Sequence, residues 1–351
     1  MSASAGTESV AAASAVNGRS SARLVEAFFR ARELSLIGVI ALITIATTAA
    51  DSNFLSAQNL RDTALNVSIV GILAIGQTVV VVSRNIDLSV GSVLGFVAFL
   101  TGRMFVDDPG LSIPLAFAIG IAVGAGFGAV NGLLVSIGRV PSLVVTLGTL
   151  YIIRGADFAW AHGREVDAAQ LPDGFLRIGS ASVASIPVLF VVGVAVMVLA
   201  GVFMRSYRPG RELYAIGSNP DAAVLAGIPV ARRVFAAFVA SGALAGLAGV
   251  LWTARFGTVD ATAAQGIELQ VVAAVVVGGV AIFGGAGSVY GAALGALLLA
   301  SIGSALGVLN VNSFWEQAID GALLLAAITL DRLLLLRLSS MLRRRGRRRG
   351  G

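Results

Sequence analysis

The sequence predicts an all-α polytopic membrane protein with about ten transmembrane helices, and its composition carries this prediction. Hydrophobic residues make up 57% of the 351 residues and charged residues only 13%, whereas a soluble domain has roughly 25% charged residues. The mean hydropathy is +0.90. Apolar runs of about 20 residues, the length that crosses a bilayer, recur along most of the chain. One soluble core cannot absorb that many apolar segments.

The distribution of these runs divides the chain into three parts. Residues 1–33 are rich in Ala and Ser, and no small-residue cleavage site closes the apolar run that follows, so we expect a flexible cytoplasmic leader. Residues 34–336 form the expected transmembrane domain, and residues 337–351 form a basic cytoplasmic tail. The ten spans are expected near residues 35–50, 64–83, 89–103, 113–136, 143–160, 186–204, 233–254, 270–284, 288–309 and 315–336.

The arginines predict the orientation, because Arg-rich loops remain in the cytoplasm. With both termini cytoplasmic, Arg84, Arg139 and the arginines of loop 205–233 lie inside, and the outer loops are acidic. The run Arg343 to Arg349 directly follows the last span. We interpret it as an anchor attracted to anionic lipid headgroups, with no role in nucleic-acid binding.

Composition also excludes several chemistries. The chain has no cysteine and one histidine, His162, so thiolate sites are excluded, and a His-based metal cluster would need carboxylates for most of its ligands. It has no lysine, and a P-loop needs a lysine to reach the nucleotide phosphates. His162 lies in a polar outer loop beside Gly163 and Arg164, where we expect no catalytic role. We therefore expect no enzyme activity, metal or cofactor on this chain, and any ATP must be hydrolysed elsewhere.

Two glycine series repeat every four residues and so lie on one helical face each. Small residues at this spacing let helix backbones approach closely within a membrane. The sequence thus predicts helix packing at these positions. They are Gly120, Gly124, Gly128 and Gly132, and Gly287, Gly291 and Gly295.

A polar break at residues 83–89 separates two strongly apolar runs. Polar residues at membrane depth survive only where protein shields them or where they line an aqueous cavity. Asp87 and Ser89 are suited to capping the next helix, and Asn85, Asp87, Ser89 and Ser92 are also candidates for the inner end of a translocation path. These two interpretations are compatible.

The long cytoplasmic loop 205–233 contains a short predicted helix. Asn219 suits the N-cap, Pro220 the first turn, and Asp221 the positive helix end. Gly227 and Pro229 terminate the helix. Its apolar side is covered either by the chain's own spans or by a cytoplasmic partner, and we favour the partner. The candidate docking residues are Gly217, Asn219, Pro220, Asp221, Ala222, Ala223, Leu225, Gly227 and Ile228.

The segment from Arg255 to Gln270 is predicted to be an outer loop that leads into a span. Glu268 and Gln270 are polar residues at the start of this span, and Gly278-Gly279 lie in its middle. The pattern is equally compatible with a pore mouth and with a helix-packing hinge. We therefore regard Glu268 and Gln270 as candidates for the translocation path.

One motif gives a specific resemblance. The run Asn85-Ile86-Asp87-Leu88-Ser89-Val90-Gly91-Ser92 resembles the signature after the second span of carbohydrate-type ABC importer permeases, the family of ribose, xylose, rhamnose and autoinducer-2 permeases. Further matches include Thr146-Leu147-Gly148-Thr149, the run from Gly210 to Asn219, and Gly284 to Ser288. Together they span roughly residues 34–336, and the chain looks closest to the rhamnose and autoinducer-2 branch.

The resemblance implies a permease subunit in a bacterial-type plasma (inner) membrane that moves a monosaccharide or similar small polyol. It implies an assembly with a second permease copy or paralogue, a cytoplasmic ATP-binding cassette subunit that carries ATP and Mg, and an extracytoplasmic solute-binding protein. The helix in loop 205–233 would then be the coupling helix on the ATPase.

Alternative functions remain open. A nucleoside or branched-chain amino-acid ABC permease is the nearest alternative. An ion-coupled secondary transporter would need ionisable groups deep within its spans, and Asp87, Arg154, Asp157 and Asp320 fall near predicted span ends. This placement weakens the secondary-transporter interpretation.

Overall fold

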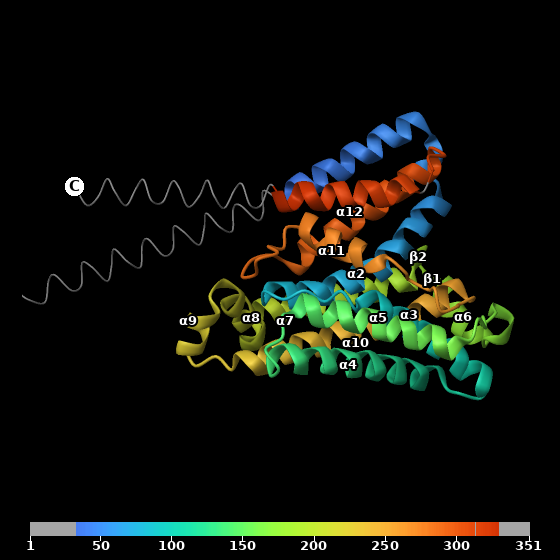
Figure 1. The fold of residues 1–351 in the computed structure, drawn as a ribbon. Coiled ribbons are helices and arrows are strands. Elements are labelled where there is room, and N and C mark those ends of the chain that lie inside the picture. Colours follow the sequence, from blue (N-terminus) through green and yellow to red (C-terminus); the bar gives the residue numbers. More distant parts are fainter. Residues whose placement is uncertain (1–32, 313, 330–351) are drawn as a thin grey trace, which may run out of the picture.

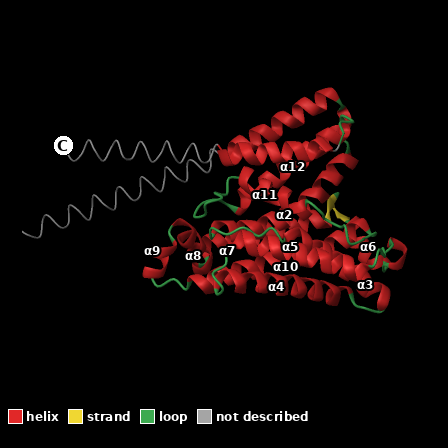
Figure 2. Ribbon diagram, in the orientation of Figure 1, coloured by secondary structure: helices red, strands yellow, loops and turns green. Residues whose placement is uncertain are grey.

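The computed structural model describes residues 33–312 and 314–329, and this part of the chain is mainly helical (Figures 1 and 2). Its one small sheet pairs β1 (Ser182–Val183) with β2 (Ile186–Pro187). Eight helices in this part are long and apolar enough to cross a membrane. The predicted all-α membrane fold is therefore confirmed. The leader up to residue 32 and the tail 337–351, including Arg343 to Arg349, lie outside the described residues.

The eight membrane-length helices are Glu33–Ala50, α2 (Ala57–Val82), α3 (Val90–Asp107), α4 (Ile113–Ser136), α5 (Ser142–Ala161), α7 (Val188–Ser206), α10 (Val230–Phe256) and α12 (Val289–Val308). The shorter elements are η1 (Ser52–Leu55), η2 (Ala168–Gln170), α6 (Asp173–Ser180), α8 (Arg208–Ser218), α9 (Pro220–Leu225) and α11 (Ile267–Val277). A C-terminal helix follows at residues 314–329. These eight helices correspond to eight of the ten predicted spans, and α11 and the C-terminal helix lie where the other two are predicted.

One predicted span is wrong in its second half. The sequence predicts a helix over residues 270–284, but α11 begins at Ile267 and ends at Val277. Gly279, Gly284, Gly285 and Gly287 all have positive φ, from 78° to 133°, and L-residues with side chains rarely adopt that backbone region. The glycines therefore produce an irregular loop at residues 278–288, and α11 crosses only part of a membrane.

Helix α2 is the centre of the bundle, with 94% of its most apolar window buried inside the chain. It contacts α10 on one side and α11 and α12 on the other. Figure 1 shows α3, α4, α5 and α10 gathered on the first side. It shows α12 and the N- and C-terminal helices on the second.

The glycine face of α4 lies against α10. A Cβ at Gly124 would be 2.2 Å from the carbonyl oxygen of Gly242, and one at Gly128 would be 2.2 Å from that of Phe238. Gly120 and Gly132 of α4 face Val250 and Phe235 of α10, respectively. Helices α4 and α10 can touch backbone to backbone only because these positions lack side chains.

The second glycine series joins α11 and α12 in the same way. A Cβ at Gly291 would be 2.2 Å from the Gly278 carbonyl oxygen, and one at Gly295 would be 2.0 Å from that of Ala274. Gly287 precedes the helix, and a Cβ there would meet Val280 at 2.6 Å. Ser288 caps α12 by accepting the Gly291 amide at 2.8 Å.

Candidate functional site

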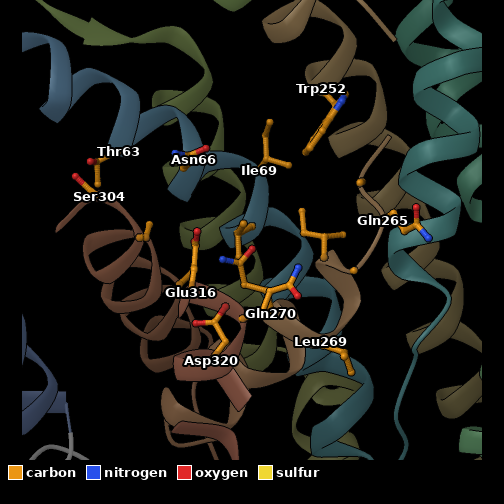
Figure 3. A pocket seen from close by; sticks show the side chains of 18 of the residues that line it. Thr63, Asn66, Ile69, Trp252, Gln265, Leu269, Gln270, Ser304, Glu316 and Asp320 are labelled. Carbon is orange, nitrogen blue, oxygen red and sulfur yellow. The ribbon is translucent and has the colours of Figure 1, made fainter. Parts of the chain in front are cut away.

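A cavity of about 940 Å³ lies between α2, α10, α11, α12, the C-terminal helix and the connecting segment 257–266. Figure 3 shows Glu316 and Asp320 facing Gln270 across this space, with Trp252 on another wall. The cavity lies at the start of α2 and the end of α10. In the predicted orientation, this is the outer end of the bundle.

Side chains that form hydrogen bonds are present on several walls of the cavity, among apolar residues. Amides, hydroxyls and carboxylates come from five separate elements, so the cavity presents both donors and acceptors in several directions. The polar lining includes Asn59, Asp62, Thr63, Asn66, Thr262, Gln265, Gln270, Ser304, Glu316, Gln317 and Asp320.

Several of these groups are held in place by other parts of the fold. The Asn59 side chain donates to the Phe54 carbonyl at 2.7 Å and accepts the Ser304 hydroxyl at 2.9 Å, which ties α2 to η1 and α12. Trp252 packs on Phe256 with ring centroids 4.5 Å apart, and the Arg255 guanidinium lies 4.6 Å from the Phe256 ring centre. The cavity thus combines fixed polar groups with an aromatic wall.

The charged groups in the lining are mainly acidic. Asp62, Glu316 and Asp320 supply carboxylates, and Arg255 is the one cationic side chain among the described lining residues. The Oδ1 atom of Asp320 is buried and has no hydrogen-bond partner within the described part of the chain. The acceptor capacity of this carboxylate oxygen is therefore unused within the described residues. The arrangement suits an uncharged polyhydroxylated molecule better than an anion.

Arg154 holds the segment that forms one wall of the cavity. Its guanidinium donates to the carbonyls of Ala261 and Ala263 at 3.1 and 2.8 Å, and to that of Gly91 at 3.4 Å. Asp157, one turn further along α5, is fully buried, and neither of its carboxylate oxygens has a partner among the described residues. Sequence reasoning missed this role of Arg154, because its carbonyl partners are more than 60 residues away along the chain.

The two path candidates in α11 point to different places. Gln270 lines the cavity, whereas Glu268 is not among its lining residues. The Glu268 carboxylate lies against α3, where a Cβ added to Gly91 would be 2.2 Å from its Oε2 atom. These two residues are two positions apart and so lie on opposite faces of α11, one toward the cavity and one toward the bundle interior.

The break at residues 83–89 forms a buried polar cluster. Asp87, only 1% exposed, accepts the Ser89 amide and hydroxyl at 3.0 and 2.6 Å and the Ser241 hydroxyl at 3.1 Å. The Asn131 amide donates to the Ser89 hydroxyl at 2.8 Å. The cluster therefore ties the start of α3 to α4 and α10.

The remaining candidates of the break satisfy local groups. The Ser89 side chain makes no capping bond to α3, and Ser92 donates to the Ser89 carbonyl at 2.8 Å. Asn85 donates to the Ser83 carbonyl at 2.9 Å. The cavity lining does not include Asn85, Asp87, Ser89 or Ser92.

Helix α9 lies beyond the opposite end of α2 from the cavity (Figure 1). Asn219 accepts the Ala222 amide at 3.0 Å, and Gly227 has φ 76°, so both ends form as the sequence predicts. Ala223 is buried against the chain, but Leu225 is 89% exposed. One side of α9 is therefore covered by the chain itself, and the other is open.

Helix α8 precedes α9 and was not expected from the sequence. It begins at Arg208, with Pro209 in its first turn, which was a signal for a helix start. Glu212 on α8 is bonded by Arg208 at 2.7 Å and by Arg233 at the start of α10. These hydrogen bonds hold the pKa of Glu212 below its ordinary value.

The far end of α8 is pressed against the end of α2 and the 278–288 loop. A Cβ at Gly217 would lie 1.9 Å from the Val82 carbonyl oxygen and 2.4 Å from the Gly285 nitrogen. The Gly285 amide donates to that same Val82 carbonyl at 2.9 Å. The Tyr214 hydroxyl donates to the Gly287 carbonyl at 3.1 Å. Helix α8 therefore connects α9 to the loop that joins α11 and α12.

Comparisons with known proteins give a consistent picture. A family model described as branched-chain amino acid transport system / permease component matches residues 59–328. The chain is 35% identical over 303 residues to the autoinducer 2 import system permease of Enterobacter sp. (strain 638). This alignment covers 86% of each of the two chains.

Two further relatives show similar agreement. The chain is 34% identical over 303 residues to the ribose import permease of Escherichia coli, covering 85% of this chain and 92% of the relative. It is 33% identical over 300 residues to a probable ABC transporter permease of Sinorhizobium fredii, covering 86% and 89%. No solved structure gives a significant match.

Proposed function

Because this chain belongs to the ABC importer permease family that includes ribose and autoinducer-2 permeases, we propose that it is the transmembrane permease subunit of a carbohydrate importer. Its substrate is a monosaccharide or similar small polyol. The observation that carries this proposal is the cavity, whose lining includes neutral hydrogen-bonding side chains and Trp252. Aromatic faces and amide or hydroxyl groups together recognise sugar rings and their hydroxyls.

The cavity is the outer part of the substrate path in this proposal. An extracytoplasmic solute-binding protein releases the sugar at the cavity mouth, and the sugar exchanges hydrogen bonds with water for hydrogen bonds with groups such as Gln270 and Asp320. Because the lining comes from α2, α11, α12 and the C-terminal helix, a small shift of any of these changes the shape of the cavity. The permease thus offers a passage, and the chain itself catalyses no reaction.

The driving reaction takes place on a partner chain, an ATP-binding cassette subunit that holds ATP and Mg. Helix α9 is the proposed docking element, because Val224 and Leu225 are 61% and 89% exposed while its ends are firmly capped. A second permease, either a copy or a paralogue, completes the assembly in a bacterial-type plasma membrane.

A branched-chain amino-acid or nucleoside permease is the second candidate, and the match to the branched-chain amino acid permease family favours it. An amino-acid carboxylate would need a cationic partner, which Arg255 supplies in the cavity. The three carboxylates around it weigh against an anionic group. We therefore favour a carbohydrate.

The decisive experiment is purification of the chain from its native membrane with the proteins that accompany it. Recovery of a P-loop ATPase and a solute-binding protein, and ATP-dependent uptake of D-ribose or L-rhamnose by reconstituted vesicles, is the expected result. Uptake of L-leucine in place of both sugars would transfer the assignment to the second candidate. A chain that transports a solute without any ATPase would overturn the proposal.

A charge reversal on α9 tests the docking step. Asp221 is exposed and lies in the first turn of α9, so Asp221→Arg should leave the fold intact and place a cation at the positive helix end. We expect co-purification of the ATPase and ATP-dependent uptake to fall by about tenfold or more. Normal gel filtration and thermal unfolding would serve as the folding control. Unchanged uptake by a correctly folded variant would contradict docking through α9.

A further inference from the structure

A second cavity, of about 400 Å³, lies at the end of the bundle that carries α8 and α9. It occupies the junction between the end of α7, the helix α8, the start of α12 and the first residue of the N-terminal helix. Its polar lining residues are Glu33, Arg205, Arg211, Tyr214, Ser288 and Tyr290. None of these residues lines the first cavity, of about 940 Å³, or belongs to the docking surface of α9.

The charges in this second cavity are unbalanced. Arg211 uses one nitrogen to donate to the Ser206 carbonyl at 3.0 Å, which leaves most of its five donors available. Arg205 makes no hydrogen bond or ion pair with any residue in 33–312 or 314–329. The one carboxylate, Glu33, already accepts the Ser288 hydroxyl at 2.7 Å. Among the described lining residues, two guanidiniums and one carboxylate leave a surplus of one positive charge.

Apolar surface borders the cavity. Leu199, Val202 and Phe203 on α7 are 71%, 45% and 40% exposed. Leu34, next to Glu33 in the N-terminal helix, is 62% exposed. In a chain that spans a membrane, such faces meet lipid acyl chains. A molecule that fills the cavity with a polar group can therefore lay a hydrocarbon tail along these helices.

The cavity also has room for hydroxyl recognition. Gly201 leaves space for the Tyr290 ring, since a Cβ there would lie 2.5 Å from the Tyr290 hydroxyl. Tyr290, Tyr214 and Ser288 thus bring three hydroxyl groups to a site with two guanidiniums. Guanidinium groups bind phosphate oxygens through pairs of parallel hydrogen bonds.

We propose that this cavity binds the headgroup of an anionic phospholipid that carries a single phosphodiester, of the phosphatidylglycerol type. One phosphodiester neutralises the surplus charge, and the glycerol hydroxyls of the headgroup match Glu33, Ser288 and the tyrosines. Basic pockets between transmembrane helices are typical sites for anionic headgroups. The bound lipid would connect α7, α8 and α12, so it would stabilise the junction through which α8 contacts the 278–288 loop.

Native mass spectrometry of the full-length chain in detergent tests the proposal. Phosphatidylglycerol should remain bound to the wild-type chain, whereas zwitterionic phosphatidylethanolamine should not. Replacing both cations, as Arg205→Gln with Arg211→Gln, should reduce the retained phosphatidylglycerol by about tenfold or more. The matched control is Arg232→Gln, which removes an exposed arginine from the same end of the bundle but outside the cavity; it should retain the lipid.

A second variant, Glu33→Gln, tests the proposal independently if the double variant folds poorly. Glu33→Gln keeps an oxygen that can accept the Ser288 hydroxyl but removes the opposing charge, so lipid retention should increase. Equal retention by the wild type and both cavity variants would overturn the proposal. Displacement of the lipid by millimolar inorganic phosphate would also overturn it, because the cavity would then be a site for free phosphate.

Discussion

Glu212 shows how one residue joins the loop helix α8 to the membrane helix α10. Its side chain is 7% exposed and accepts hydrogen bonds from Arg208 on α8 and Arg233 on α10. Breaking such a network by removing one partner leaves a buried charge uncompensated, which costs more than the loss of an exposed ion pair. Glu212 therefore fixes the position of α8 relative to α10.

This ion-pair network predicts a pH dependence. The pKa of Glu212 is lowered in the folded chain by its hydrogen bonds to Arg233 and Arg208, from an ordinary value of 4.5. Below pH 4.5 Glu212 is protonated in the unfolded chain but remains ionised in the folded chain. Its contribution to the free energy of unfolding is therefore complete above that pH and declines as the pH falls towards the lowered pKa. Glu212→Gln should be less stable at neutral pH and should lose this part of the acid sensitivity.

Thermal unfolding in detergent between pH 3 and 7 measures the effect. Glu165→Gln, on the exposed loop between α5 and α6, is the matched control and should keep the wild-type profile. An unchanged acid profile in Glu212→Gln would show that another group is responsible.

At the scale of elements, helix packing depends on glycines: the backbone of the facing helix lies where a side chain would otherwise be. Gly124 of α4 and Gly242 and Gly246 of α10 face each other closely, whereas Gly126 of α4 has no atom within 4 Å of its Cβ position. Gly124 is packed against α10, whereas Gly126, two residues further along α4, has free space at its Cβ position.

This contrast predicts opposite effects of the same substitution. Gly124→Ala places a methyl group 2.2 Å from the Gly242 carbonyl oxygen, so overpacking should destabilise the fold by about 1–3 kcal/mol. Gly126→Ala meets no atom and gains helix propensity, so it should be neutral or should stabilise by up to about 1 kcal/mol. Thermal unfolding of the two variants in one detergent compares them directly. Equal effects would mean that α4 and α10 do not depend on this contact.

At the scale of the whole molecule, the polar cavity and α9 lie at opposite ends of α2 and α10. The contacts between them run through α8, the end of α2 and the 278–288 loop to α11, whose Gln270 lines the cavity. This series of contacts is the structural route by which a partner on α9 would change the shape of the cavity.

Gly217 lies at the narrowest point of this route and predicts a separation of function. Gly217→Ala places a methyl group 1.9 Å from the Val82 carbonyl oxygen, so α8 must move away from α2 while α9 stays exposed. We expect the variant to retain the ATPase on purification but to lose at least about tenfold of its ATP-dependent uptake. The matched control, Gly126→Ala, should transport normally. Normal uptake by Gly217→Ala would exclude this route.

The sequence by itself determined the fold class, the eight membrane-length apolar helices and the helix at Asn219. These features depend on local properties: apolar runs about as long as a bilayer is thick, and capping residues next to the turns that they cap. The family was also recognisable, because its motifs are contiguous.

Only the tertiary structure decided which polar residues share a cavity. Asn59, Gln270, Ser304 and Asp320 come from four different segments, and no periodicity relates them. It also decided that α11 ends at Val277, since four glycines adopt backbone angles that depend on their surroundings. The hydrogen-bond partners of Arg154 and Glu212 were likewise revealed only by the tertiary structure. Long-range contacts are set by how the helices pack, and a pattern along one segment does not contain that information.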